Sequence, residues 1–461
     1  MAATIGDVYM KPLFATFLLS GAIALAQPAP KPIKFTDTTL DNGLRVIISE
    51  DHNAPVFGIA VSYKVGSRDE RQGRTGFAHL FEHMMFKGSQ NVGAGEHPYL
   101  ISTNGGNLNG TTDTDRTLYY EVLPKNQLDL GLFLEADRMR SLAVTKDNLE
   151  NQRQAVKEER RLRMDNQPYG PASEKMDELV YDNFAYHHSV IGSMADLDAA
   201  SVEDFQQFFK TYYAPNNAVI ALVGDIDSKE ALAKAKKYFG DIPRQNPPKP
   251  VDLAETAKDA ERRLKIDDKL ARATRIDIAY RIPETTSAET RALSIGALIL
   301  AGGESSRLYQ KLVKEKEVAS AIFGGIDGRA GPSKIEIVAM VRPGKTPEEV
   351  EGLISEEVAK FLSEPVTEKE MKRVRMSIRR TALVGGRESV LSMAANLADS
   401  TALYNDPNRI NTEYEKRLAV TPADIQKAAQ KYMRQANRVV VVSVPAGGGP
   451  PMRGAASPKQ N

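Results

Sequence analysis

Apolar positions recur along this chain with two different periods, which predicts a fold that mixes strands with helices. Short apolar runs bounded by turn residues, such as RVIISE after the Asn42-Gly43 turn, are typical of strands. Longer runs with a period near 3.6, such as residues 128–142, predict amphipathic helices. Few of these runs alternate as strand, helix, parallel strand, so we expect an α+β fold whose sheets are largely antiparallel and packed with helices.

The order of predicted elements partly repeats on either side of a proline-rich stretch. The sequence PRQNPPKPVDLAE, residues 243–255, is polar and rich in proline, which is typical of a linker. We therefore predict two similar domains. Their predicted limits are residues 34–242 and 263–446, with a linker at 243–262 and a disordered tail at 447–461. Within the first domain we read the Thr- and Tyr-rich segment LNGTTDTDRTLYYEVL as one strand.

The N-terminus has the parts of a secretory signal peptide. Lys11 precedes an apolar run that ends in Ala24-Leu25-Ala26, a small-x-small cleavage pattern. The run is too short to span a bilayer comfortably, so we expect no stable membrane anchor. We predict a signal peptide at residues 1–26, with Met10 as an alternative start, and an exported protein that is periplasmic or secreted.

Composition narrows the function classes. The chain has 461 residues, 41% of them hydrophobic and 26% charged, which is typical of a globular protein with large cores. Its formal net charge of +1 argues against a nucleic-acid partner, because such proteins usually carry a basic excess. There is no cysteine, so the fold needs no disulfide.

The segment GFAHLFEHMMFKGS, residues 76–89, predicts a helix with two different faces. At about 100° per residue, His79, Glu82 and His83 share one side, and the other side is apolar. Two histidines four residues apart can bind one zinc ion through neutral ring nitrogens. A carboxylate beside them can accept a proton from a water molecule. The alternative is a pair of packed core histidines, but three ionisable groups on one face are costly to bury without a function.

A catalytic zinc ion usually has three protein ligands, so a third ligand is expected elsewhere. The helical pattern of residues 145–165 offers Glu158 and Glu159. The apolar face that we assign to this helix consists of Leu149, Ala155, Val156 and Leu162. Glu159 falls inside that face and Glu158 at its edge, and a carboxylate on a buried face needs a partner. We therefore choose Glu159 and keep Glu158 as the second candidate.

Together these residues resemble the M16 family of metallopeptidases, which includes pitrilysin, insulin-degrading enzyme and the mitochondrial processing peptidase. The family motif HxxEH is followed about 76 residues later by a glutamate, and Glu159 lies 76 positions after His83. The resemblance extends from LDNGLRVIISED to the strand near residue 440. It implies one zinc ion per chain on His79, His83 and Glu159, with Glu82 as the general base of a zinc-dependent endopeptidase.

The resemblance also implies how peptides bind. A substrate strand is expected to add to a sheet edge near Asn109, Gly110 and Thr111, which belong to the segment LNGTTDTDRTLYY. Such pairing suits unfolded peptides or oligopeptides. A catalytically silent core or assembly subunit is the alternative function, and the intact HxxEH motif with its distant glutamate disfavours it.

Two departures from the family pattern stand out. Many relatives carry a second glutamate seven residues before the third ligand, where this chain has Gln152, a residue that can still hydrogen-bond near the metal but adds no charge. Active single-chain relatives also carry an Arg and a Tyr where this chain has Val313 and Ser320. Arg307 and Tyr309 are nearby at a different offset.

The missing pair predicts a partner subunit. We expect a heterodimer with an M16-type chain that carries the Arg/Tyr pair, and the alternative is a homodimer in which Arg329 supplies the positive group.

Four other histidines carry less weight. His187-His188 could suggest a second metal site, but a surface or loop-packing role is favoured. His52 and His97 fall in segments that we read as loops without partners.

Overall fold

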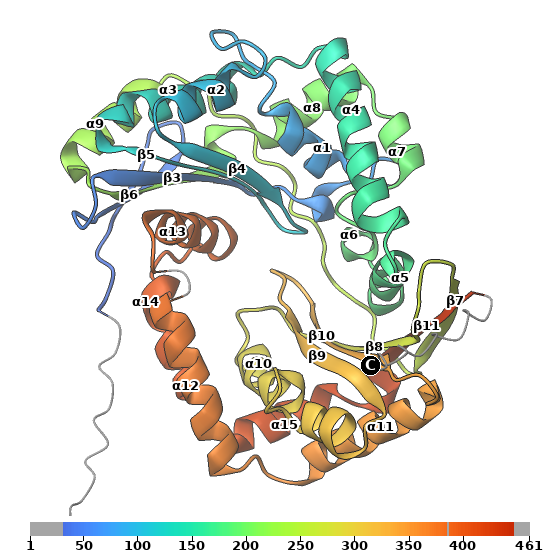
Figure 1. Ribbon diagram of the computed structural model, residues 1–461. Helices are drawn as coiled ribbons and strands as arrows, with labels where there is room; N and C mark the ends of the chain where they lie inside the picture. The colour runs from blue at the N-terminus through green and yellow to red at the C-terminus, as the bar shows by residue number, and fades with distance from the viewer. Residues whose placement is uncertain (1–30, 385–386, 447–461) are drawn as a thin grey trace, which may run out of the picture. The chain divides into compact units, whose positions relative to one another are not determined.

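The computed structural model describes residues 31–384 and 387–446 of the chain. The predicted signal peptide at residues 1–26 and the predicted tail at 447–461 lie outside the described residues. From Ile33 onward the chain forms one compact unit, in which two sheets are packed with helices (Figure 1). Among the described helices, none has the length and apolar character needed to cross a bilayer.

The first sheet is built from strands that precede residue 243. Its order is β1-β2-β6-β3-β5-β4. Its strands are β1 (Thr36–Thr39), β2 (Arg45–Glu50), β3 (Val56–Tyr63), β4 (Asn107–Thr112), β5 (Thr117–Pro124) and β6 (Ala218–Gly224). Strands β2 and β6 are parallel, and the other neighbours are antiparallel. Strand β4 pairs with β5 alone in the described sheet, so it forms an edge.

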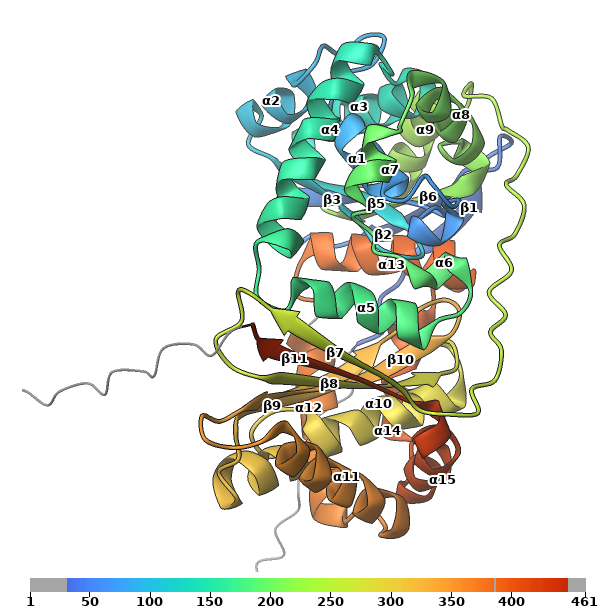
Figure 2. The same cartoon turned by 90° about the vertical axis from the view of Figure 1, so that its right-hand side faces the viewer.

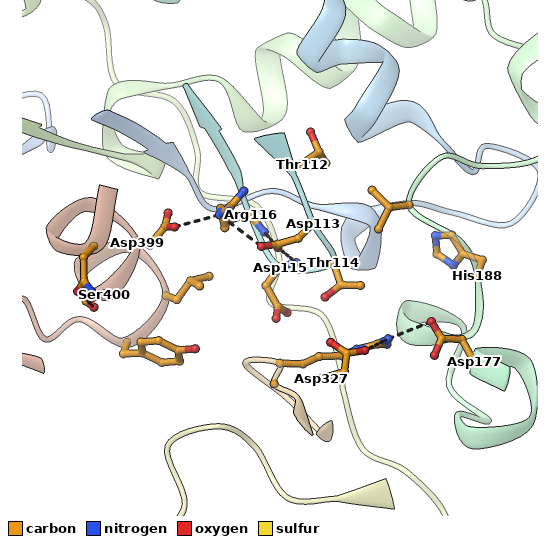
Figure 3. A pocket seen from close by; sticks show the side chains of 16 residues that line it. Thr112, Asp113, Thr114, Asp115, Arg116, Asp177, His188, Asp327, Asp399 and Ser400 are labelled. Carbon is orange, nitrogen blue, oxygen red and sulfur yellow. Dashed lines mark hydrogen bonds and ion pairs between the residues drawn. The ribbon is translucent and has the colours of Figure 1, made fainter. Parts of the chain in front are cut away.

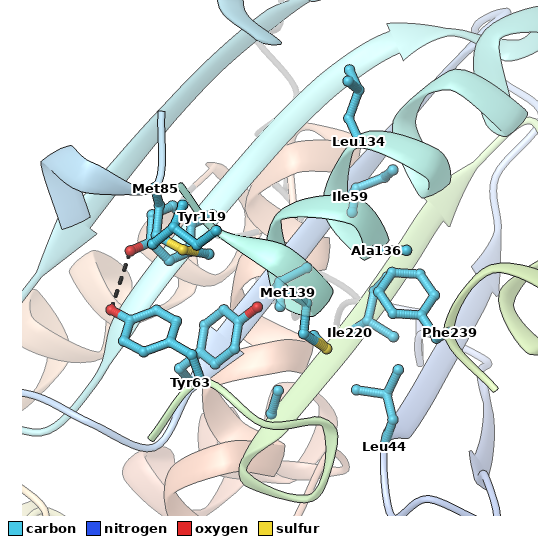
Figure 4. Packing of buried hydrophobic residues seen from close by; sticks show 14 of the residues in the cluster. Leu44, Ile59, Tyr63, Met85, Tyr119, Leu134, Ala136, Met139, Ile220 and Phe239 are labelled. Atoms are coloured by element: carbon cyan, nitrogen blue, oxygen red, sulfur yellow. Dashed lines mark hydrogen bonds between the residues drawn. The ribbon is translucent and has the colours of Figure 1, made fainter. Parts of the chain in front are cut away.

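The same part of the chain contains the helices and turns, several of which cover one face of this sheet. They are η1 (Ser67–Asp69), α1 (Phe77–Met84), α2 (Glu96–Thr103), η2 (Lys125–Gln127), α3 (Leu128–Ser141), α4 (Lys146–Arg160), η3 (Arg161–Asp165), α5 (Gly170–Val180), α6 (Phe184–His187), α7 (Met194–Asp198), α8 (Val202–Tyr212), η4 (Pro215–Asn217) and α9 (Ser228–Phe239). Ile59 and Ile220 of the sheet share a buried core with Leu134 of α3 and Phe239 of α9 (Figure 4). Phe81 of α1 belongs to the same core. The apolar side of α1 packs into this core.

The second sheet repeats the connectivity of the first. Its order is β7-β11-β8-β10-β9. Its strands are β7 (Arg262–Asp268), β8 (Arg275–Ile282), β9 (Ala319–Asp327), β10 (Ser333–Val341) and β11 (Arg438–Pro445). Again one neighbour pair is parallel, β7 with β11, and the rest are antiparallel. The helices and turns of this half are α10 (Ala288–Ala301), η5 (Tyr309–Glu315), α11 (Pro347–Ser363), α12 (Glu368–Val384), α13 (Val390–Tyr404), α14 (Arg409–Leu418), α15 (Pro422–Tyr432) and η6 (Gln435–Asn437).

The two halves exchange one helix each. Helix α13 packs on the first sheet, where Ala394 and Leu397 share a buried cluster with Ile47 and Ala221. Helix α5 packs on the second sheet with β8 and β11, as Figure 2 shows. Because residues i and i+1 of a strand face opposite sides, a sheet can bind its own helices on one side and the visiting helix on the other. Neither half buries both faces of its sheet without the other.

The α+β prediction with largely antiparallel sheets is confirmed, and three details of it are wrong. The segment read as one strand is a hairpin, because Asp113 Oδ1 accepts the N–H groups of Asp115 and Arg116 and turns the chain between β4 and β5. Strand β9 was not predicted, because Gly324 and Gly325 weaken its strand pattern. Strand β7 was missed as well, because charged residues alternate along one face of it.

Candidate metal centre

Helix α1 carries the HxxEH residues over an apolar base. Phe77, Leu80, Phe81 and Met84 are buried in the first core, so packing fixes the rotation of the helix about its axis. The helix starts after Gly76, whose φ of 84° lies in the left-handed region that glycine tolerates. The face of α1 opposite to this core carries His79 and His83, whose side chains are 12% and 25% exposed.

Both imidazoles converge on one carboxylate oxygen from α4. The Nε2 atoms of His79 and His83 lie 3.6 Å and 3.3 Å from Glu159 Oε2, and the two rings are 4.9 Å apart. Donor atoms about 2.0–2.2 Å from a tetrahedral zinc ion are about 3.3–3.6 Å from one another. The three side chains therefore have the chemistry and the spacing of a zinc site.

On helix α4, Glu159 and not Glu158 lies beside the two histidines. The side chain of Glu158 points to solvent and pairs with Arg161 at 3.0 Å. The apolar face assigned from the sequence is partly wrong, because Ala155 is exposed and Leu162 is 58% exposed. Leu162 follows the change from α-helical to π-helical turns at residue 161, which alters the angular position of later residues. Glu159 lies before that change and faces α1.

Glu82 lies on α1 between the two histidines in sequence and is held by strand β4. The residue is 9% exposed, and its Oε2 accepts a hydrogen bond from Thr112 Oγ1 at 2.6 Å. A Cβ atom at Gly110 would come within 3.0 Å of Glu82 Cγ, so glycine lets the strand approach the carboxylate. Thr112 was not predicted as a site residue. Its contact with Glu82 depends on how β4 lies against α1, which no sequence pattern indicates.

Burial sets the protonation of this centre. It raises the pKa of Glu82, which favours a carboxylate that can hold a proton. Burial, followed by the neighbouring His83, lowers the pKa of His79 to about 4, so this imidazole is neutral at pH 7, as a metal ligand must be. The hydrogen bond from His83 holds the pKa of Glu159 below its usual value. Arg163 contacts the other oxygen of Glu159 at 2.8 Å.

Gln152 and the predicted substrate residues occupy different surroundings. Gln152 is buried, its amide donates to Asn151 Oδ1, and within the described residues no hydrogen bond joins it to the two histidines or to Glu159.

Asn109, Gly110 and Thr111 lie on β4, the edge strand. The Gly110 N–H is bonded at 2.8 Å to the side chain of Asn109 rather than to β5, so it belongs to the free side of the strand.

Two cavities meet at the end of β4. One of about 340 Å³ is lined by His79, Thr112 and Glu159 among others. The other, of about 580 Å³, lies against Asp113, Asp327 and Asp399 (Figure 3). Both are bordered by Thr112, Asp177 and Val190. The two cavities are therefore neighbours at the end of β4.

Charges in the larger cavity are mostly paired with one another. Asp399 accepts from Arg116 Nε at 3.1 Å. Arg329 is 3% exposed, donates to Asp177 and Asp327, and lies over the rings of Tyr181 and Tyr186. The prediction that Arg329 could supply a free positive group is therefore wrong for this chain.

The two positions where the Arg/Tyr pair is expected differ in exposure. Val313 is buried in η5, and Ser320 is exposed on β9. The guanidinium of the nearby Arg307 makes two hydrogen bonds to Glu370 and is not free.

The remaining histidines all have partners, which corrects the reading of His52 and His97 as unpaired loop residues. His52 Nδ1 lies 2.7 Å from Asp225. His187 and His188 bond to backbone carbonyls, and His188 also meets Glu70.

His97 lies on α2 inside a buried group with Glu121 and Glu135. This group also has metal-ligating atoms close together. However, Arg138 Nε donates to Glu135 at 3.0 Å, so a cation already balances the carboxylates. Burial lowers the pKa of His97 to about 3 and raises that of Glu135 to about 7, so the cluster carries little net charge. We assign it to the core.

Comparison with known proteins gives consistent matches along the chain. The family model "Insulinase (Peptidase family M16)" matches residues 45–192, and "Peptidase M16 inactive domain" matches residues 199–378. The first match contains α1 and Glu159. The second begins before β6 and ends within α12.

Several full-length relatives are similar to this chain. "Zinc protease PqqE" of Helicobacter pylori is 29% identical over 417 residues, which cover 89% of this chain and 93% of that protein. "Uncharacterized zinc protease ML0855" of Mycobacterium leprae is 27% identical, with 86% and 89% covered. A solved structure described as a protease from Helicobacter pylori superposes with a TM-score of 0.85 at 28% identity, over 90% of this chain and 100% of that chain.

Proposed function

Because this chain belongs to the M16 peptidase family, we propose that it is a zinc-dependent endopeptidase that hydrolyses peptide bonds in unfolded peptides or oligopeptides. Relatives named zinc proteases support a metalloprotease at the level of the family. The observation that carries the proposal for this chain is the convergence of His79 and His83 on Glu159 at 3.6 Å and 3.3 Å, on the wall of a cavity.

Each residue has a defined task in this reaction. His79, His83 and Glu159 would hold one zinc ion, which when bound polarises a peptide carbonyl and makes a water molecule more acidic. Glu82 takes the proton of the attacking water on its carboxylate and delivers it to the nitrogen of the leaving amine. The Thr112 hydroxyl orients that carboxylate through its hydrogen bond. Burial raises the pKa of Glu82, which suits a group that must hold a proton between the two steps.

Substrates are proposed to bind as an added strand on β4. The strand is an edge of the first sheet, and the Gly110 N–H is on its free side. Backbone pairing requires an extended, unfolded chain and depends weakly on side chains. Asn109 would release the Gly110 N–H to a substrate carbonyl. Thr111 is the next residue on the strand, and its backbone groups point to β5, because they alternate sides along an antiparallel strand.

A partner subunit is proposed for full activity. Neither Val313 nor Ser320 can give the charge-assisted hydrogen bond that an arginine gives to a developing oxyanion. The arginines nearest to the larger cavity and to η5 are held by carboxylates of this same chain. An M16-type subunit that carries an Arg/Tyr pair, or a second copy of this chain that offers another residue, would supply the group.

Export is proposed as well, with removal of residues 1–26 and a periplasmic or secreted location. Its support is the sequence pattern of Lys11, the apolar run and Ala24-Leu25-Ala26. Mass spectrometry of the protein from its native host tests this. An intact Met1 or Met10 would contradict it.

The second candidate function is a non-catalytic core or assembly subunit. It is favoured by the match of the second half to a family model described as an inactive domain and by the absence of the Arg/Tyr pair at Val313 and Ser320. It predicts a protein that pairs with M16-type chains but hydrolyses no peptide.

Replacement of the general base separates the two functions. Glu82→Gln should keep the metal and lower peptide hydrolysis by roughly 10²- to 10⁴-fold, because the amide cannot carry the proton. Glu158→Gln is the matched control, since that carboxylate is exposed and pairs with Arg161. The measurements are zinc content by atomic emission and cleavage of a random peptide library with and without a chelator. A fully active Glu82→Gln protein, or a wild-type protein that cleaves nothing, would overturn the enzymatic assignment.

A further inference from the structure

A buried carboxylate caps the helix that carries the two histidines. Glu70 follows η1, and its side chain has 0% exposure. Its Oε2 accepts the Gly76 N–H at 2.9 Å, and its Oε1 accepts the Ala78 N–H at 2.8 Å. Helix α1 begins after a glycine, which has no side chain to bond the free N–H groups of the first turn. Glu70 does this from outside the helix and places a negative charge at its positive end.

His188 completes this cap. Its Nε2 lies 2.9 Å from Glu70 Oε2, and its Nδ1 lies 2.8 Å from the carbonyl oxygen of Phe184, on whose ring the imidazole stacks at 4.5 Å. A carbonyl oxygen can only accept, so Nδ1 carries a hydrogen. Nε2 and Glu70 Oε2 share a hydrogen bond, which fixes the imidazole against the cap. Burial lowers the pKa of His188, but the hydrogen bond and charge of Glu70 together with the backbone hydrogen bonds outweigh burial, and the pKa is raised.

The residues after His188 form a wall of the metal cavity. Ser189, Val190 and Ile191 line the same cavity as His79 and Glu159. At the end of this run, Gly192 packs backbone against backbone on Gly76. A Cβ atom on Gly192 would lie 2.4 Å from Gly76 Cα, and its φ of 75° also favours glycine. The segment 188–192 is thus fixed to the start of α1 at both of its ends.

The same segment is bonded to the helix that carries the third ligand. Arg160, the neighbour of Glu159, donates from Nη1 to the Gly192 carbonyl at 2.6 Å. Its guanidinium is itself fixed by Glu174 through bonds of 2.6 Å and 3.0 Å. Segment 188–192 therefore bridges the start of α1 and the end of α4, the two elements whose side chains must meet within a few tenths of an ångström to bind one ion.

We propose that Glu70 and His188 are positioning residues for the metal centre, which set the placement of α1 relative to α4 and thereby the approach of His79 and His83 to Glu159. The proposal rests on the proposed zinc chemistry of these three side chains. Neither Glu70 nor His188 touches the metal ligands, so they act through the first turn of α1 and through segment 188–192. A role limited to helix stability is the competing interpretation.

Metal affinity and ligand geometry distinguish these two roles. The test uses the full chain as wild type, Glu70→Gln and His188→Gln. Asp227→Asn is the matched control, because Asp227 Oδ1 also accepts two N–H groups at a helix start, those of Lys229 and Glu230 at 3.0 Å and 2.9 Å on α9. Zinc affinity is measured by competition with a chromophoric chelator, and the visible spectrum of the Co²⁺-substituted protein reports the coordination. Thermal unfolding without metal measures the stability cost of each exchange.

The expected result is a rise in the zinc dissociation constant of roughly 10- to 100-fold for Glu70→Gln and for His188→Gln. The cobalt spectrum should change with it, and the double variant should resemble the single ones. Asp227→Asn should change stability alone.

If both variants bind zinc as the control does, with the wild-type cobalt spectrum, the proposal is wrong. Should Glu70→Gln fail to fold, His188→Gln, which leaves the helix cap in place, decides by the same criterion. If the wild-type protein binds no zinc, or if His79→Ala binds it equally well, the proposed function fails instead.

Discussion

The two sheets of this protein have the same connectivity and different chemistry. The order β2-β6-β3-β5-β4 of the first corresponds to β7-β11-β8-β10-β9 of the second, and each begins with its parallel pair. In both halves a helix that follows the central strand reaches a glycine on the edge strand. A Cβ atom on Gly110 would come within 3.0 Å of Glu82 of α1, and one on Gly324 within 2.8 Å of Ala301 of α10. The topology sets the contact, and the helix side chains determine its chemistry.

The contrast extends to the charges of each half. Helix α1 presents three ionisable groups over an apolar base, whereas the buried positions of α10 are apolar apart from Thr290. In the second half, charged side chains form ion pairs with one another, as Arg307 does with Glu370. A histidine that binds a metal must be neutral. The first half meets this condition at His79.

Loss of a ligand should give the largest effect and should distinguish the two halves. We expect His83→Ala and Glu159→Ala to lose the zinc ion and to reduce hydrolysis to background, because three ligands hold the ion. Glu370→Gln in the second half should retain zinc, although it breaks the pair with Arg307. Metal analysis with peptide cleavage checks this. A zinc-replete, active Glu159→Ala protein would remove the third ligand from the assignment.

Addition of a partner should give the next largest effect. If the second half of this chain lacks the oxyanion donor, an M16-type subunit with the Arg/Tyr pair should raise kcat roughly 10²- to 10³-fold. Copurification from the native host, followed by assays of each chain and of the mixture, measures this. Full activity of the pure chain, unchanged by the added subunit, would show that the second half is complete.

The two edge strands should differ in substrate binding. Gly110→Pro removes the free-side N–H of β4 and should raise KM roughly 3- to 10-fold, the range for one or two backbone hydrogen bonds. Gly110→Ala controls for the close contact with Glu82. Gly325→Pro on β9, where a Cβ atom meets nothing within 4 Å, should leave KM unchanged. Equal effects of both prolines would show that the two edges bind peptide alike.

A buried carboxylate in the second half should affect stability and not catalysis. Burial raises the pKa of Asp277 on β8 to about 6, against about 3.9 in an unfolded chain. The folded state therefore binds the proton more tightly, and its stability gains as the pH falls from 7 toward 4. We expect the stability of wild type relative to Asp277→Asn to rise by about 1 kcal/mol between pH 7 and pH 5.

Denaturant unfolding at the two pH values measures this difference. A difference that does not change with pH would mean that Asp277 keeps an ordinary pKa.

Some features could be predicted from the sequence because they depend on neighbours along the chain. The face shared by His79, Glu82 and His83 follows from the helical period alone. We chose Glu159 over Glu158 because it falls on the predicted apolar face of the helix. That face is only partly buried, since Leu162 in the π-helical turn is exposed. The structure places Glu159 beside the two histidines and Glu158 in solvent.

Other features could not be predicted, because two distant segments make them together. The hairpin at Asp113 depends on which of several possible bonds an aspartate makes in a polar segment. His97 pairs with Glu121, and His188 pairs with Glu70. In both pairs the two residues are far apart in the sequence, and no local pattern indicates that they meet.

The sequence by itself determined the α+β class, the linker composition and the HxxEH face, since periodicity and local spacing encode them. The tertiary structure alone decided that Thr112 bonds to Glu82, that α13 and α5 exchange sheets, and that Glu70 with His188 caps the helix that carries His79 and His83. These contacts depend on the register of one element against another, which the packing of whole cores fixes to a fraction of an ångström. No local pattern in the chain carries that register.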